Sequence, residues 1–355
     1  VRELRVLSAS DPLPFQVNDD THLANEDLRL RYRYLDLRRP ELARVLELRH
    51  RVCQAVRRHL SGESFLEIET PILVKPTPEG ARDYVVPSRV HPGKFYALPQ
   101  SPQLYKQTLM IAGCDRYFQI ARCMRDEDLR ADRQPEHTQI DLEMSFVREE
   151  DVFDVIEGLY AHLWKTCLGV ELPLPFPRLT FAEAMGRFGS DKPDLRFGLE
   201  LTDVSAAAEA SGAAFLREAV ARGERVIGLA APGRATLSRK EIDGLEEIAK
   251  RAGAKGLAWM KRTADGFEGA SAKFFTGDAA GAGQELARLV SAQEGDLVMM
   301  VAGRWEDACK ALGAVRLELG RAALEGNGRA KEWCFLWVRD FPLFAHRYAA
   351  LVDGS

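Results

Sequence analysis

Two alternating stretches on either side of a charged loop constrain the fold of this chain more than any other feature. Residues 117–127 read YFQIARCMRDE, and residues 138–146 read TQIDLEMSF. Successive side chains of a β-strand point to opposite faces, so the odd-numbered residues of each stretch share one face. We expect a β-hairpin with one largely polar face, made of Tyr117, Gln119, Ala121, Cys123, Arg125 and Glu127 before the loop and Gln139, Asp141, Glu143 and Ser145 after it.

A plain solvated hairpin would show the same alternation, so this pattern alone does not define a binding site. The polar face continues across both strands, however, and ends in a long loop with charges of both signs, LRADRQPE at 129–136. That combination also indicates a floor built to hold a polar ligand, and the rest of the sequence has to decide between the two.

Length and composition exclude several classes of protein. A chain of 355 residues exceeds the usual size of one hydrophobic core, so we expect two or more domains. The net charge of −4 gives no global basic surface, and a nucleic-acid partner would have to be met by local arginine clusters. No apolar run approaches the roughly 20 residues of a membrane span.

The six cysteines are scattered, without a CxxC motif and without closely spaced histidines. Zinc sites and disulfide frameworks depend on such spacing, so we expect neither and predict no metal-binding residues in the chain. Scattered free cysteines are typical of a reducing compartment, which predicts a cytoplasmic protein.

Apolar periodicity predicts the order of elements in the first part of the chain. Residues 1–9 resemble a strand without partners, and a linker rich in proline, asparagine and aspartate follows. Apolar residues at three- and four-residue spacing predict a helix over 42–60, with Gly62 as its stop. A strand is expected next, and it ends at Pro71 because proline cannot donate within a ladder.

Further along, a proline-bounded turn leads into a helix from about Pro102, and an amphipathic helix is expected near 149–167. After about residue 198 alanine and glycine become frequent, and strands alternate with helices. Ser238 and Glu241 form a capping box that opens one of these helices. This block is typical of a separate small α/β domain.

Four strings in fixed order now point to a known family: RYRYLDLRRP at 31–40, TPEGARDY at 77–84, ALPQSPQLYKQ at 97–107 and RDEDLRADRQPEHTQIDLE at 125–143. Together they resemble the class II aminoacyl-tRNA synthetases and, more narrowly, the bacterial-type aspartyl-tRNA synthetases. The resemblance implies an α+β fold: an antiparallel-sheet catalytic core, here incomplete, with an inserted small α/β domain. It also implies a cytoplasmic homodimer that acts as an aspartate–tRNA ligase, with ATP, L-aspartate and an aspartate-accepting tRNA as partners.

The same resemblance divides the chain into four parts. These are the end of an N-terminal OB-fold with its linker at 1–24, a catalytic domain with two signature motifs at 25–198, the inserted domain at 199–328, and the resumed catalytic domain at 329–355.

Site residues are carried over from the family one position at a time. Arg125 matches the catalytic arginine that bridges the substrate carboxylate and the α-phosphate. A guanidinium between two anions relieves their repulsion and offers bidentate contacts. Lys106 would give the side-chain carboxylate of aspartate a positive partner that asparagine cannot use equally well. The full set implied for aspartate binding is Glu79, Ser101, Gln103, Lys106, Arg125 and Asp141, and the set implied for ATP is Arg125, Asp126, Glu127, Gln134 and His137.

The remaining assignments concern macromolecular partners and the metal. Arg130 and Arg133 on the hairpin loop are similar to family residues that reach the acceptor end of tRNA. Pro71 closes the unit that in the family builds the dimer interface. Because the acids of the hairpin outnumber its arginines, a polyphosphate would enter with Mg²⁺ screening it.

Three departures from the family pattern qualify these expectations. His137 stands where the family has a phenylalanine on which adenine stacks. Of the OB-fold that grips the anticodon, only the last strand is expected at the start of the chain. The third signature motif, with its arginine for the γ-phosphate, does not follow residue 344, and neither do the acidic metal ligands. We therefore expect a chain truncated at both ends, with Mg²⁺ ligands in the missing part and with nearly abolished adenylation.

Two other functions remain open at this point. One is a non-catalytic RNA- or protein-binding synthetase fragment. The other is a free-standing amino-acid ligase, such as an asparagine-forming relative, and the inserted block and the RADRQPE loop argue against it.

Overall fold

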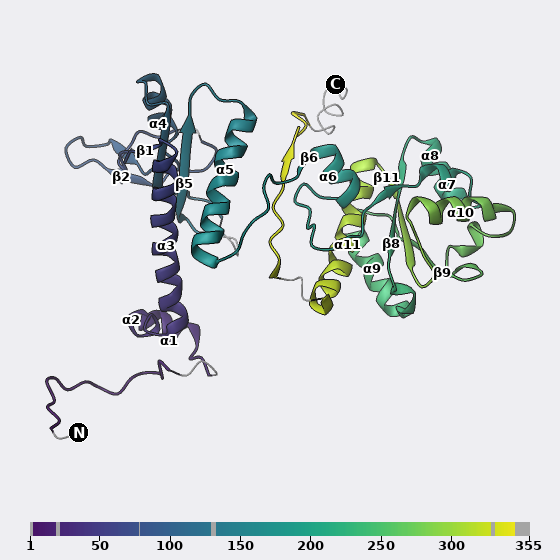
Figure 1. Ribbon diagram of the computed structural model, residues 1–355, viewed down its shortest axis with the longest axis horizontal. Helices are drawn as coiled ribbons and strands as arrows, with labels where there is room; N and C mark the ends of the chain where they lie inside the picture. The colour runs from purple at the N-terminus through teal and green to yellow at the C-terminus, as the bar shows by residue number, and fades with distance from the viewer. Residues whose placement is uncertain (1–2, 19–21, 78, 129–132, 328–330, 345–355) are drawn as a thin grey trace. The chain divides into compact units, whose positions relative to one another are not determined.

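The computed structural model describes residues 3–18, 22–77, 79–128, 133–327 and 331–344, with the side chains of 325–327 left out. It is a mixed α+β structure that contains antiparallel sheets (Figure 1). The chain divides into two compact units between Pro175 and Phe176, and each unit is described by itself. No helix in the described ranges combines the length and the apolar character that a membrane crossing requires.

The first unit is built around one long helix and a small sheet. Helix α3, Pro40–Gly62, carries proline at its first turn and ends at the glycine predicted as its stop. Its buried side chains Ala55, Val56 and Leu60 pack with Phe118 of the sheet and with Leu159. Helix α5, Glu149–Leu163, completes this core and continues into the π-helical turn η1, Trp164–Leu168.

The sheet of the first unit has the order β1-β4-β5, with β1 at Leu66–Glu67, β4 at Arg116–Met124 and β5 at Glu136–Met144. Strand β1 runs parallel to β4, whereas β4 and β5 form an antiparallel hairpin. The other elements are α1 Glu26–Arg31, α2 Arg33–Asp36, the antiparallel pair β2 Val85–Pro87 and β3 Phe95–Ala97, and α4 Gln103–Ile111.

Two predicted strands differ from the structure. The strand expected to run to Pro71 is only two residues long, because β1 pairs with β4 at Leu66 and Glu67 alone. Residues 3–18 hold neither helix nor strand, and Leu4 and Leu7 are largely exposed. A strand is stable only with a neighbour to bond, and alternation in a sequence does not reveal whether that neighbour exists.

The second unit centres on a five-stranded sheet in the order β10-β9-β11-β8-β7, and every pair in it is antiparallel. The alternation of helices and strands after residue 198 is present, but this sheet makes the block α+β rather than an α/β domain with parallel strands. Its strands are β7 Thr202–Asp203, β8 Arg225–Ala231, β9 Ala258–Thr263, β10 Gly266–Glu268 and β11 Leu297–Gly303.

Both faces of this sheet are buried. Alternate residues of β11 serve opposite cores: Met299 packs with α9 and α11, whereas Met300 packs with α7, α8 and α10. Opposite Met300 on β8 stands Gly228, where an added Cβ would lie 2.9 Å from Val204. The helices are α6 Phe181–Phe188, α7 Ser205–Glu209, α8 Ala214–Ala221, α9 Arg239–Arg251, α10 Ala280–Leu289 and α11 Trp305–Asn327, with short 3₁₀ turns at 234–236, 272–274 and 277–279.

Helices α6 and α11 pack very closely where glycines meet. Gly189, in the left-handed conformation at the end of α6, lies so near α11 that a Cβ would be 2.2 Å from the Cys309 carbonyl oxygen. Arg316 of α11 is fully buried, donates to the backbone carbonyls of 194 and 197–199, and stacks on Phe197. Segment 176–198 thus packs with the block predicted to begin at residue 199. The division of the chain into four domains remains a prediction.

Two short strands of the second unit come from distant parts of the sequence. Strand β6, Arg178–Thr180, pairs in parallel with β12, Trp337–Arg339.

The capping box predicted for α9 is confirmed, since the Ser238 hydroxyl accepts from the Glu241 backbone N–H and the Glu241 carboxylate accepts from the Ser238 N–H.

Candidate active site

The predicted hairpin is confirmed, and its register places the polar residues on one face. Gln119 lies opposite Asp141, and Cys123 lies opposite His137. Residues directly opposite each other in an antiparallel pair present their side chains on the same side of the sheet. The other face, with Phe118 and Ile120, packs into the core of α3 and α5.

A buried lysine joins helix α4 to this polar face. The Lys106 ammonium contacts the Asp141 Oδ1 atom at 2.9 Å and the Glu143 Oε2 atom at 3.0 Å. Lys106 is 7% exposed and Asp141 is 2% exposed. Burial lowers the pKa of Lys106, but hydrogen bonds to the two carboxylates outweigh this effect and the net shift is upward. Lys106 is therefore a fixed cation at neutral pH.

Two buried polar atoms of this region lack a hydrogen-bond partner among the described residues. They are the Asp141 Oδ2 atom, an acceptor, and the Arg125 Nε atom, a donor. A buried group left without a partner costs about 1–3 kcal/mol, so such groups in native proteins call for an explanation. An anionic acceptor and a cationic donor together match the ammonium and the carboxylate of an amino acid.

The Cys123 thiol is the buried group on the same face of the hairpin that these charges affect. Burial raises the pKa of Cys123, and the Asp141 carboxylate raises it further, while Arg125 and Lys106 lower it and Glu79 raises it. The hairpin register supports this grouping, because Cys123 lies on the same face as Asp141, whose carboxylate contacts Lys106. The structure thus brings Glu79, Lys106, Arg125 and Asp141 to one region of the sheet.

The remaining residues predicted for aspartate binding lie beside α4. The Ser101 hydroxyl donates to the Glu79 Oε2 atom at 2.7 Å, and the Thr77 hydroxyl donates to Oε1 at 3.1 Å. Gln103 is the first residue of α4, one turn before Lys106, and its side chain is partly exposed.

Four of the five residues predicted for ATP line a pocket of about 370 Å³ at the loop end of the hairpin. Within it, Arg133 donates to the Glu127 carboxylate at 3.3 Å. Asp126 is not in the lining; its backbone pairs with Arg82 in an isolated antiparallel bridge. Arg130 lies outside the described residues. The pocket is lined by Arg125, Glu127, Asp128, Arg133, Gln134, Pro135 and His137.

Several contributors to this face were not singled out from the sequence. The Gln139 amide donates to Asp141 Oδ1 at 3.0 Å, and Tyr117 donates to Gln119 at 2.8 Å. Burial, with Asp141 nearby, raises the pKa of Tyr117 well above its usual range. The alternation that marked the polar face already contained these residues. Gln100, buried beneath residues 81–83, carried no such signal.

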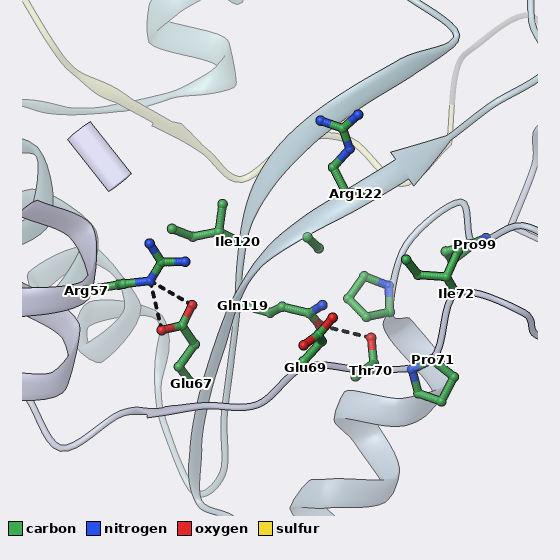
Figure 2. A pocket seen from close by; sticks show the side chains of 12 residues that line it. Arg57, Glu67, Glu69, Thr70, Pro71, Ile72, Pro99, Gln119, Ile120 and Arg122 are labelled. Carbon is green, nitrogen blue, oxygen red and sulfur yellow. Dashed lines mark hydrogen bonds and ion pairs between the residues drawn. The ribbon is translucent and has the colours of Figure 1, made fainter. Parts of the chain in front are cut away.

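Pro71 lines a second pocket, of about 440 Å³, at the edge of β4 beyond the end of β1 (Figure 2). In Figure 2 Arg57 and Glu67 point toward each other, with the Arg57 Nε atom 3.0 Å from the Glu67 carboxylate. The Thr70 hydroxyl donates to Gln119 at 2.9 Å. This pocket shares no lining residue with the predicted aspartate and ATP sets.

Among the residues that the structure describes, no group of three or more His, Cys, Asp and Glu side chains is arranged to hold a metal ion. Divalent cations such as Mg²⁺ take oxygen ligands and often rely on substrate phosphates for some of them. The described residues alone therefore do not form a Mg²⁺ site.

Comparison with known protein families identifies the family of the chain. Residues 25–353 match the family described as tRNA synthetases class II (D, K and N). The chain belongs to this family. The class II resemblance of its four motifs is thereby confirmed.

Similar proteins narrow the comparison. The chain is 52% identical to "Aspartate--tRNA ligase" of Geobacillus kaustophilus, over 97% of this chain and 57% of the relative. It is also 52% identical to "Aspartate--tRNA(Asp/Asn) ligase" of Moorella thermoacetica, over 98% of this chain and 58% of that protein. The class II chain thus spans a little over half the length of the curated relatives it matches.

Among solved structures, the chain is similar to the asparaginyl-tRNA synthetase of Pyrococcus horikoshii, complexed with asparaginyl-adenylate. The identity is 25% and the TM-score is 0.45, over 52% of this chain and 45% of that one.

Proposed function

We propose that this class II chain serves as an aspartate–tRNA ligase, which activates aspartate with ATP and transfers it to tRNA. The observation that carries the proposal is the pair of buried atoms without partners, Arg125 Nε and Asp141 Oδ2, beside the fixed cation Lys106. Both of the relatives named above act on aspartate, whereas their names differ in the tRNA. Aspartate is therefore the proposed amino acid, with the aspartate-accepting tRNA alone or the aspartate- and asparagine-accepting tRNAs together as acceptors.

Aspartate carries one positive and two negative groups, and the polar face offers a partner for each. The Asp141 Oδ2 atom would accept from the α-ammonium, and Arg125 would bind the α-carboxylate. The Lys106 ammonium donates to Asp141, lies 3.0 Å from the Glu143 carboxylate and donates more weakly to the Leu142 carbonyl oxygen at 3.4 Å. Its charge favours the side-chain carboxylate of aspartate over the neutral amide of asparagine. Glu79, Ser101 and Gln103 would complete the aspartate site.

In the activation step, an α-carboxylate oxygen of aspartate attacks the α-phosphorus of ATP. The bond to the β-phosphate oxygen breaks, and pyrophosphate leaves as the aspartyl-adenylate forms. No protein nucleophile takes part, so positioning and electrostatic stabilisation supply the rate. Arg125 is the catalytic residue, because it would contact both the carboxylate and the α-phosphate.

The pocket at the loop end of the hairpin suits the nucleotide. The imidazole of His137 offers a flat surface on which adenine can stack, while Glu127 and Gln134 would contact ATP. Asp126 directly follows Arg125, and its backbone pairs with Arg82. Asp126 would therefore support the ATP site through its backbone. Mg²⁺ would accompany the phosphates and neutralise part of their charge, but no group of the described residues is arranged to hold it.

In the transfer step, a ribose hydroxyl at the acceptor end of tRNA attacks the carbonyl carbon of the adenylate. The hydroxyl proton is lost and AMP leaves with the bonding electrons. Arg133 and Arg130 would contact the RNA backbone, which binds cations through its phosphates.

The finer architecture and the dimer belong to the same proposal. The β4–β5 hairpin would form part of the class II catalytic sheet, and the block at 199–328 would be its inserted domain. Pro71 would lie at a homodimer interface. Exposed Leu66, Ile72 and Leu73 next to the pocket of Figure 2 support an apolar contact there.

Calorimetric titration of the purified chain with non-hydrolysable analogues of aspartyl- and asparaginyl-adenylate tests the proposal. We expect the aspartyl analogue to bind at least tenfold more tightly. Arg125→Gln should weaken it about 10- to 100-fold, since a hydrogen bond to a charged group contributes about 1.5–3 kcal/mol.

Arg122→Gln is the matched control. Arg122 lies on β4, three residues before Arg125, and pairs with Glu136 on the opposite face of the hairpin, so its substitution should change the affinity less than twofold. Equal binding of the two analogues, or equal effects of the two substitutions, would refute the proposed function.

A further inference from the structure

Gln100 lies in the turn between β3 and α4 and is 2% exposed. Its side-chain amide bonds to both backbone groups of Ala81: Nε2 donates to the carbonyl oxygen at 2.9 Å, and the Ala81 N–H donates to Oε1 at 3.2 Å. The Nε2 atom also donates to the Asp83 carboxylate. One side chain thereby satisfies both backbone groups of Ala81, as a neighbouring strand would, and also binds the Asp83 side chain.

The opposite side of this segment is held by the end of the hairpin. The Asp126 N–H donates to the Arg82 carbonyl oxygen at 3.1 Å, and the Arg82 side chain lies 3.5 Å from the Asp126 carboxylate. Asp126 directly follows Arg125. Residues 81–83 therefore bridge the turn before α4 and the strand end that carries the catalytic arginine.

The same segment fixes a carboxylate at the other half of the site. Glu79 stands two residues before Ala81 and accepts from the Ser101 hydroxyl at 2.7 Å. Gly80 between them has a φ of +95°, a conformation that favours glycine. Because Gln100 and Ser101 are consecutive, both bonds tie the segment to one turn.

We propose that Gln100 is a positioning residue of the activation site. By holding Ala81–Asp83 between the turn and Asp126, it sets the place of Glu79 relative to Arg125, and so the fit of a ligand that spans both. Gln100 itself touches no substrate. The identity of the ligand rests on the proposed function. The hydrogen bonds by which Gln100 holds residues 81–83, called the clamp below, do not depend on it.

Gln100→Glu tests this inference with almost no change of shape. The glutamate keeps an oxygen for the Ala81 N–H, loses both donated bonds and brings a second negative charge to Asp83. We expect the affinity for the aspartyl-adenylate analogue to fall about 10- to 100-fold. Binding of ATP alone, which needs only the hairpin pocket, should change less than about threefold.

Adding Asp83→Asn to Gln100→Glu restores the bond with donor and acceptor exchanged, because an asparagine amide can donate to the new carboxylate. This double variant should recover at least threefold of the lost affinity but not all of it, because the bond to the Ala81 carbonyl oxygen stays lost. Gln107→Glu, on the exposed side of α4, introduces the same charge and should have no effect. Failure of the double variant to recover, or an equal effect at Gln107, would overturn the inference.

Hydrogen exchange of the peptide that covers 79–85, followed by mass spectrometry without ligand, tests the clamp independently. Gln100→Glu should speed exchange of the Ala81 amide, and the Asp83→Asn combination should slow it again. If the unaltered chain binds no adenylate analogue, the proposed function fails. Hydrogen exchange alone then shows whether Gln100 holds residues 81–83 in place. Unchanged exchange, or equal losses for the analogue and for ATP, would leave Gln100 a merely structural residue and refute its positioning role.

Discussion

Replacing Lys106 with methionine should destabilise the first unit far more than loss of an ordinary ion pair. The side chains are similar in length, but Asp141 and Glu143 lose their shared cation. Removing one partner of a buried pair costs about 3–5 kcal/mol. The Glu143 side chain is 27% exposed and keeps some hydration, so we expect the low end, about 3 kcal/mol.

Thermal unfolding followed by circular dichroism measures this effect. For a unit of this size each kcal/mol shifts the melting temperature by about 2–4 °C, so Lys106→Met should lower it by about 6–12 °C. Lys165→Met is the control, because Lys165 and its partner Glu171 are both largely exposed, and we expect no clear shift.

A second substitution identifies the cause. Asp141→Asn in the Lys106→Met background removes the buried negative charge and should recover part of the lost stability. If Lys106→Met melts like the Lys165 control, or if Asp141→Asn lowers stability further in that background, the buried cluster does not work as described.

Three further predictions follow from the same structure. The pKa of Lys106 is raised above its ordinary value of 10.5, so the stabilisation by its charge is complete below pH 10.5 and is lost as the pH rises through the folded-state pKa. The difference in melting temperature between the unaltered chain and Lys106→Met should therefore narrow above pH 10.5. A constant difference would contradict this. Gly189→Ala should destabilise the second unit by more than about 2 kcal/mol in urea unfolding, because the added methyl group meets the Cys309 carbonyl at a positive φ, whereas Gly244→Ala, with no atom within 4 Å, should be neutral or stabilising. Ser238→Ala removes the N-cap of α9 and should cost about 1 kcal/mol in the same assay, with no loss for Ser8→Ala, whose hydroxyl caps no helix.

Local patterns predicted the hairpin and its polar face well, because period-2 alternation and helix capping depend on neighbours in sequence. They also placed α3 up to its last residue, Gly62. The short extent of β1 and the antiparallel order of the five-stranded sheet could not be read in this way. Both depend on which segments meet in space, and Leu66 carries no mark of the residue it pairs with.

For the candidate site, the family motifs gave the residue types but not their contacts. The pairing of Lys106 with Glu143, and not only with Asp141, depends on how α4 lies on the sheet. Gln100 was missed because a buried amide that replaces a strand has no pattern in sequence. Roles of the individual site residues stay predictions until ligand binding is measured.

Burial of both faces of the five-stranded sheet has a consequence for strand alignment. A one-residue slip normally turns apolar side chains into water, and this penalty selects the correct pairing. In β11 a slip would merely exchange Met299 and Met300 between two apolar cores. The contrast between apolar and polar surroundings therefore cannot determine the register of β11, and the fit of side chains within the two cores has to determine it. Strand β8, the partner of β11, shows such a constraint: Gly228 has no side chain where it lies against Val204, and a one-residue slip of β8 would bring Ile227 or Leu229 into that place, where either would collide with Val204.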